Sequence, residues 1–101
     1  MKLGEGLFNI YYNRFVTTVH QEELSTTETL TTSSNMVQLF KSGGGVGRDI
    51  VLPAEGDSTN LCFYISCNGF TGTVKNDGGS TIRTLNHEGA WFFCDGTDWY
   101  G

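Results

Sequence analysis

The sequence has few basic residues, a single proline and no long apolar stretch. Lysine and arginine together number six, against eleven acidic residues, and they are scattered singly between Lys2 and Arg83. Because non-specific nucleic-acid binding needs a basic face that displaces counterions, we expect no nucleic-acid partner. No window approaches the roughly eighteen consecutive apolar residues of a membrane span. The first residues also lack the apolar centre of a secretory signal, so we expect neither a membrane partner nor export.

Charged residues make up only 17% of the chain, which is too few for a coiled coil. Aromatic residues reach 13%, which is too many for a disordered chain. With 101 residues and a net charge of -5, the chain has the size of one small acidic domain with one core. That core must depend on a few large rings, because the apolar share is 38%.

Three cysteines, Cys62, Cys67 and Cys94, form an odd set, whereas secreted disulfide frameworks usually have an even number. All three lie in strand-like apolar runs, where a reduced thiol behaves as a small hydrophobic group. We therefore predict buried free thiols and assembly in a reducing cytosol. One disulfide with a third thiol left over is the alternative.

From Leu24 onward, short apolar runs alternate with Gly, Asn and Asp turns about every ten residues. Residues 29–32 lead into the first expected strand, 36–40, and the others are 49–52, 61–66, 71–75, 81–85, 90–94 and 97–100. Pro53 ends the strand 49–52, because proline donates no ladder hydrogen bond. In the strand 61–66, Phe63 and Ile65 share one face and Tyr64 lies on the other. The pattern predicts an all-β fold, a small antiparallel sandwich or barrel, over residues 24–101.

Residues 1–23 are predicted to form an extended N-terminal arm. Leu7, Tyr11 and Phe15 recur every four residues, which a helix could use, but helix propensity is poor and no capping box precedes them. As a strand, the segment has apolar groups on both faces, and such a strand needs cover on both. A neighbouring subunit or a larger partner would supply that cover. The predicted interface residues are Leu7, Phe8, Ile10, Tyr11, Tyr12, Phe15, Val16 and Val19, together with Trp99 and Tyr100.

Metal-ligand spacings are weak in this sequence. Cys62 and Cys67 are expected to point to opposite faces of a strand, and neither His20 nor His87 has a ligand partner at a familiar spacing. A zinc site that combines both of these cysteines with His87 and Cys94 is the least favoured alternative. We expect no metal ion and no cofactor.

Catalytic motifs are not recognisable either. No Gly-x-Ser-x-Gly elbow is present, and the stretch Gly43–Gly47 lacks the Lys-Ser or Lys-Thr of a phosphate loop, so it is expected to be a linker or hairpin tip. Asp95 and Asp98 flank a turn and are expected to form an Asx turn rather than a catalytic pair. We predict that the protein is not an enzyme.

The aromatic residues near the C-terminus have two interpretations. Trp91, Trp99 and Tyr100 could form a platform on which a sugar stacks. Alternatively, Trp91 and Phe93 belong to the core, while Trp99 and Tyr100 dock the C-terminus or fill an interface. We favour the second interpretation, because such large groups are rarely left exposed.

From Asp49 onward, about half of the chain resembles a module that recurs in virion proteins of tailed bacteriophages. Its pattern is a strand ending in Leu-Pro, a Phe-x-Ile strand followed by Asn, a Gly-x-x-Ile strand and a closing Asp-Gly-Thr-x-Trp. The matching segments are Ile50-Val51-Leu52-Pro53, Phe63-Tyr64-Ile65-Ser66-Cys67-Asn68, Gly79-Ser80-Thr81-Ile82 and Cys94-Asp95-Gly96-Thr97-Asp98-Trp99. Such modules are typically all-β, often trimeric, and occur in tail fibres, tail spikes and head decorations.

The resemblance implies a structural virion protein and transfers no catalytic residue. The short chain and its apolar arm favour a capsid decoration or cement protein, assembled in the host cytoplasm and located in the virion. Its expected partners are the major capsid protein and other copies of itself in a homotrimer. The alternative is a carbohydrate-binding or receptor-binding module of a tail fibre.

Overall fold

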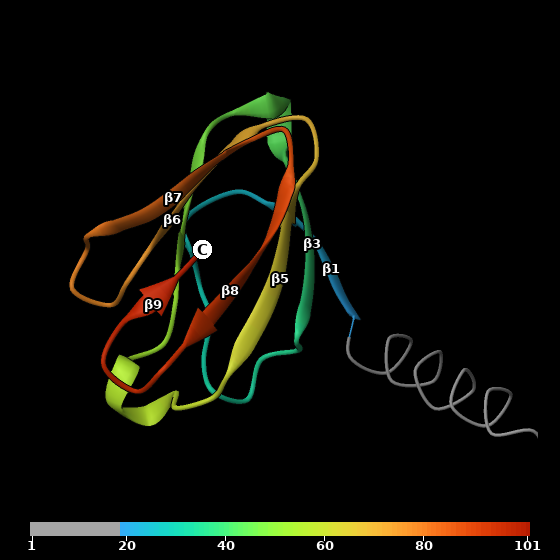
Figure 1. The fold of residues 1–101 in the computed structure, drawn as a ribbon. Coiled ribbons are helices and arrows are strands. Elements are labelled where there is room, and N and C mark those ends of the chain that lie inside the picture. The colour runs from blue at the N-terminus through green and yellow to red at the C-terminus, as the bar shows by residue number, and fades with distance from the viewer. Residues whose placement is uncertain (1–18) are drawn as a thin grey trace, which may run out of the picture.

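The computed structural model describes residues 19–101, which form an all-β fold of two facing sheets (Figure 1). Of the predicted interface residues, those from Leu7 to Val16 lie outside the described residues. The strands are β1 Val19–Leu24, β2 Glu28–Thr29, β3 Val37–Ser42, β4 Arg48–Val51, β5 Cys62–Cys67, β6 Thr71–Lys75, β7 Thr81–Asn86, β8 Gly89–Cys94 and β9 Trp99–Tyr100. Two short 3-10 turns, η1 Gly43–Gly45 and η2 Glu55–Asp57, lie in the connections.

The first six strands alternate between the two sheets. β1, β3 and β5 lie side by side in a five-stranded sheet of order β1-β3-β5-β8-β9, which we call sheet A. β2, β4 and β6 lie in a four-stranded sheet of order β2-β4-β6-β7, which we call sheet B. Each successive pair of strands therefore places one strand in sheet A and the next in sheet B. Of the last three strands, β7 belongs to sheet B, and β8 and β9 belong to sheet A.

The prediction of an antiparallel fold is wrong for four of the seven strand pairings among the described residues. Within each sheet the strands from successive passes run parallel, namely β1 with β3, β3 with β5, β2 with β4 and β4 with β6. They are parallel because the chain leaves a sheet at the end of one strand, runs back through a strand of the other sheet, and then re-enters the first sheet at the same end as before. Only β5–β8, β6–β7 and β8–β9 are antiparallel. The two sheets are mixed and stay open, so the fold is a sandwich and not a closed barrel.

Side chains on the inner faces of both sheets form one core. Sheet A contributes Phe40, Phe63, Ile65 and Phe92, each almost fully buried. Their partners from sheet B and the connecting loops include Leu30, Ile50, Leu52, Phe70, Val74 and Leu85. Full burial of one such side chain contributes roughly 1.5–3 kcal/mol, so a few large rings suffice for a chain of this size.

The hairpin between β6 and β7 matches the turn that the sequence predicts at Asp77-Gly78-Gly79. The backbone N–H of Asn76 donates to Ser80 O at 2.9 Å, and that of Gly79 donates to Asn76 O at 3.0 Å. Gly79 has a φ of 91°, a conformation that residues with a Cβ rarely adopt. The expected linker at Gly43–Gly47 connects β3 of sheet A to β4 of sheet B, and its first three residues form η1.

Gly72, on the inner face of β6, has no room for a side chain. A Cβ there would collide with Cys67 Sγ and would lie 3.3 Å from Ile50 Cδ1. We predict that Gly72→Ala lowers the free energy of unfolding by about 1–3 kcal/mol, the usual effect of overpacking. Gly56→Ala is the matched control, because a Cβ there meets nothing within 4 Å. Urea unfolding of both variants measures the difference, and equal stability of the two would contradict this packing.

Candidate functional site

Four aromatic side chains lie on the outer face of sheet A, which we call the aromatic face: Tyr64, Trp91, Phe93 and Tyr100. Tyr64 pairs in register with Trp91, and Phe93 pairs with Tyr100, so the four occupy two neighbouring rows across β5, β8 and β9. Trp91 is 50% exposed, Phe93 46% and Tyr100 52%. Exposed large apolar groups gathered in this way usually mark a binding surface.

Strand β8 explains why these rings are exposed. It is apolar on both faces, and Phe92 and Cys94 take the inner face, where they are fully buried. Trp91 and Phe93 must then point outward, since successive residues of a strand alternate between faces. The interpretation that placed Trp91 and Phe93 in the core is therefore wrong. Tyr64 and Trp91 contact each other edge to face, with ring centroids 5.3 Å apart.

Trp99 is buried, with 4% exposed, on the inner face of β9. Its Nε1–H donates to Pro53 O at 2.9 Å, and its ring lies 5.9 Å from that of Phe63. Three segments that carry the sequence resemblance therefore meet at this ring: Leu52-Pro53, the Phe63 strand and the closing Asp-Gly-Thr-x-Trp. Because Trp99 is buried within its own chain, it cannot contact a sugar or a partner in this conformation. Of the three aromatic residues considered for such a contact, only Trp91 and Tyr100 are exposed.

The turn before Trp99 is the expected Asx turn. Asp95 Oδ1 accepts from the backbone N–H groups of Thr97 and Asp98, both at 2.8 Å. Asp95 Oδ2 accepts from the Tyr100 hydroxyl at 3.1 Å, which fixes that ring on the aromatic face. The Asp98 and Thr97 N–H groups hold the pKa of Asp95 below its usual range, and the bond to Asp95 raises the pKa of Tyr100.

A lowered pKa of Asp95 means that its stabilising effect is present above the pKa of an unfolded aspartate, about 4, and is lost as the pH falls through the folded value. We predict that Asp95→Asn lowers the melting temperature at pH 7 and that the difference from the wild type shrinks below about pH 4. Asp98→Asn is the control, because Asp98 takes part in this turn through its backbone N–H and carbonyl and not through its side chain. Thermal melts across pH 2–8 check this, and a pH-independent difference would contradict it.

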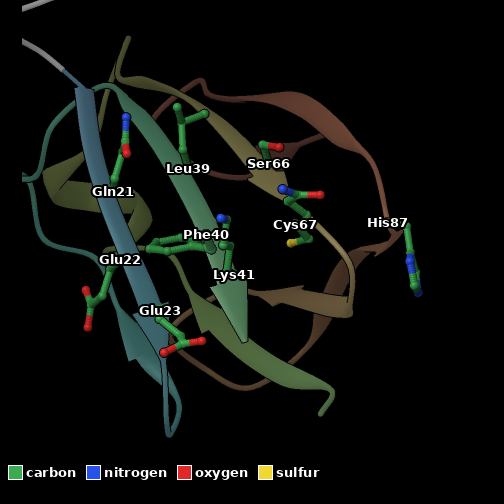
Figure 2. A pocket seen from close by; sticks show the side chains of 10 residues that line it. Gln21, Glu22, Glu23, Leu39, Phe40, Lys41, Ser66, Cys67 and His87 are labelled. Atoms are coloured by element: carbon green, nitrogen blue, oxygen red, sulfur yellow. The ribbon is translucent and has the colours of Figure 1, made fainter. Parts of the chain in front are cut away.

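A pocket of about 510 Å³ opens beside β1, β3 and β5, and Figure 2 shows the residues that line it. Its wall is polar, with Gln21, Glu23, Lys41 and Ser66 from the outer face of sheet A. Phe40 and Cys67 belong to the core beneath it. His87 lies at the far side of the pocket, apart from Ser66 and Cys67 (Figure 2).

The pocket does not assemble an activated nucleophile from the residues that the structure describes. Burial raises the pKa of the Cys67 thiol to about 11, so this group stays protonated near neutral pH. Neither histidine in residues 19–101 hydrogen-bonds to a serine or cysteine. All three cysteines are free thiols, Cys67 and Cys94 buried and Cys62 partly so.

A second polar cluster joins the two sheets. His20 Nε2 lies 2.9 Å from Glu22 Oε1 and 4.0 Å from Glu28 Oε2. Partial burial is the main cause that raises the pKa of Glu28, and the charge of Glu22 and a hydrogen bond to it act in the same direction. The charge interaction with His20 acts in the opposite direction and lowers the pKa of Glu28. These are the described residues best placed to hold a metal ion.

Sequence reasoning missed this cluster. His20 and Glu22 are two residues apart and therefore share one face of a strand, which the sequence could have indicated. Glu28 comes from β2 in the other sheet, and only the crossing between sheets brings it close. Val19, the one residue of the predicted arm interface that the structure describes, begins β1 and is partly buried beside Val37.

Comparison with family models, curated proteins and solved structures gives no match to this chain. No helix among residues 19–101 has the length and apolar character needed to cross a membrane.

Proposed function

We propose that this chain is a structural binding protein that attaches to a protein surface through its aromatic face. The observation that carries the proposal is the exposure of Trp91, Phe93 and Tyr100 together on one side of sheet A. Tryptophan and tyrosine are the residues most enriched where binding energy concentrates at protein interfaces. Their backbone already lies in a sheet, so little chain entropy is lost when a partner covers them.

The energy available from this surface is sufficient for specific binding. A large aromatic side chain buries about 150–250 Å², and the three rings are about half exposed. Covering them would remove roughly 300 Å² of apolar surface from water, worth about 7 kcal/mol before the costs of association. A rim of further contacts is needed for a stable complex, and residues 1–18 are our proposed source.

The class of protein that we propose is a bacteriophage capsid decoration or cement protein, as the sequence resemblance implies. The major capsid protein would be its partner, with further copies of the chain in a homotrimer. The support within this chain is that three of the four segments carrying the resemblance contact one another at Trp99, namely Leu52-Pro53, the Phe63 strand and the closing Asp-Gly-Thr-x-Trp. The net charge of -5 would keep free copies apart in solution.

We predict that Trp91→Ser weakens co-sedimentation of the full chain with capsid shells by at least about thirty-fold, the effect of losing a binding hot spot. Val46→Ser is the matched control, because Val46 is equally exposed but lies outside the aromatic face. Both variants should keep the melting temperature of the wild type within a few degrees. Undiminished binding by Trp91→Ser would overturn the proposed role of the aromatic face.

The contribution of the arm is tested by deleting residues 1–18, which leaves β1 intact because this strand begins at Val19. We predict weaker binding by this truncated chain than by the full chain in the same sedimentation assay. A deletion that extended to residue 20 would also remove part of β1. Weaker binding could then come from a damaged sheet A and not from the missing arm.

A second candidate, a carbohydrate-binding or receptor-binding module of a phage tail fibre, is favoured by the exposed ring of Trp91 beside Tyr64. An exposed indole can stack on the apolar face of a sugar. Glycan-array binding that Trp91→Ala abolishes and Val46→Ala preserves would favour this candidate. The number of copies per particle separates the two, because a decoration protein follows the capsid lattice and a fibre module is present in few copies.

A further inference from the structure

The side chains of His20, Glu22 and Glu28 converge where the end strands of the two sheets meet. β1 is the first strand in the order of sheet A, and β2 is the first strand in the order of sheet B. His20 and Glu22 share a face of β1 with Leu24, which is buried in the core. The ring of His20 lies edge to face with that of Phe40, with ring centroids 6.2 Å apart, so one side of the imidazole packs on the core while the side chain stays partly exposed.

The spacing of the three groups suits one small cation. One ligand atom from each residue lies within 4.8 Å of the other two, and His20 Nε2 is 2.9 Å and 4.0 Å from the glutamate oxygens. A tetrahedral zinc ion with bonds of about 2.0–2.1 Å holds neighbouring ligand atoms roughly 3.4 Å apart. Small rotations of the three side chains would therefore reach that geometry.

The local charge also favours a cation. Two carboxylates face each other here, and within residues 19–101 His20 is the only basic group within 4.0 Å of either. Glu28 is mostly shielded and the other two side chains are partly exposed, so an ion can enter from solvent.

Gln38 provides an independent observation beside the cluster. It pairs in register with His20 on β3, so the two side chains share one face of sheet A. Gln38 is buried, and its Oε1 has no hydrogen-bond partner in the described part of the chain. A metal-bound imidazole usually donates its second N–H to such an acceptor, which fixes the ring.

We propose that His20, Glu22 and Glu28 bind a divalent transition-metal ion of the zinc type, with water completing its coordination. Imidazole nitrogen with carboxylate oxygen is a donor set that zinc accepts. The ion would join β1 to β2, and thus sheet A to sheet B, close to the start of β1 at Val19. This site is independent of the proposed binding through the aromatic face.

The test is calorimetric titration of zinc chloride into the tag-free full chain, with thermal melts in zinc and in EDTA. We expect one saturable site and a higher melting temperature in zinc. Glu28→Gln should weaken zinc binding by at least about ten-fold, since even outer partners of a metal site have effects of that size. Glu23→Gln, with the same change of charge on the other face of β1, should bind like the wild type.

His20→Asn and His87→Asn form a second matched pair, in which only the first should lose zinc. Cobalt substitution adds a spectroscopic readout, because tetrahedral cobalt absorbs strongly in the visible range. If the wild type binds no zinc, or if Glu23→Gln and His87→Asn lose as much affinity as Glu28→Gln and His20→Asn, the proposed site is wrong. In that case the charged side chains of His20, Glu22 and Glu28 would serve only to keep the edge strands β1 and β2 from pairing with strands of other chains.

Discussion

A β-strand has two faces, and in this fold only the inner face of sheet A can be covered by sheet B. Strand β8 has large apolar groups on both faces, so burying Phe92 forces Trp91 and Phe93 outward. The same rule sends Tyr64 outward from β5 when Phe63 and Ile65 enter the core. The aromatic face is therefore a consequence of packing the core, and a one-residue shift in register would exchange the two sets of rings.

The short C-terminal strand holds this arrangement in place. Trp99 fills the core and bonds to the carbonyl of Pro53, and Asp95 holds the turn before it. Tyr100, the next residue, must then point outward into line with Phe93. The closing Asp-Gly-Thr-x-Trp motif thus has two effects, since it anchors the chain on the inside and completes the binding surface that we propose on the outside.

The sequence predicted the strands better than their arrangement. The strand that Pro53 ends, the alternation within β5 and the hairpin at Gly79 all follow from local chemistry, and the structure confirms them. The parallel pairing could not be predicted, because alternation with a period of two is the same in parallel and antiparallel strands. Short connections between strands suggested hairpins, whereas six of the eight connections between the described strands carry the chain across to the other sheet.

The candidate sites were harder to predict for the same reason. An apolar strand such as β8 does not indicate which of its faces is inside, so the prediction that Trp91 belongs to the core is wrong, and this ring is half exposed. Trp99 is buried within its own chain, which agrees with a docked C-terminus. Glu28 joins His20 only because the chain crosses between the sheets within a few residues. Long-range topology, which no local pattern encodes, decides both cases.

If the aromatic face is the binding surface, as we propose, a partner covers the outer rings of sheet A when the protein is bound. Hydroxyl-radical footprinting with mass spectrometry tests this directly, on the free protein and on the same chain mixed with the capsid shells that we propose as its partner. We expect Trp91, Phe93 and Tyr100 to be oxidised in the free protein and protected in the bound state, while the equally exposed Val46 changes little. Equal oxidation of Trp91 and Tyr100 in both states would contradict it.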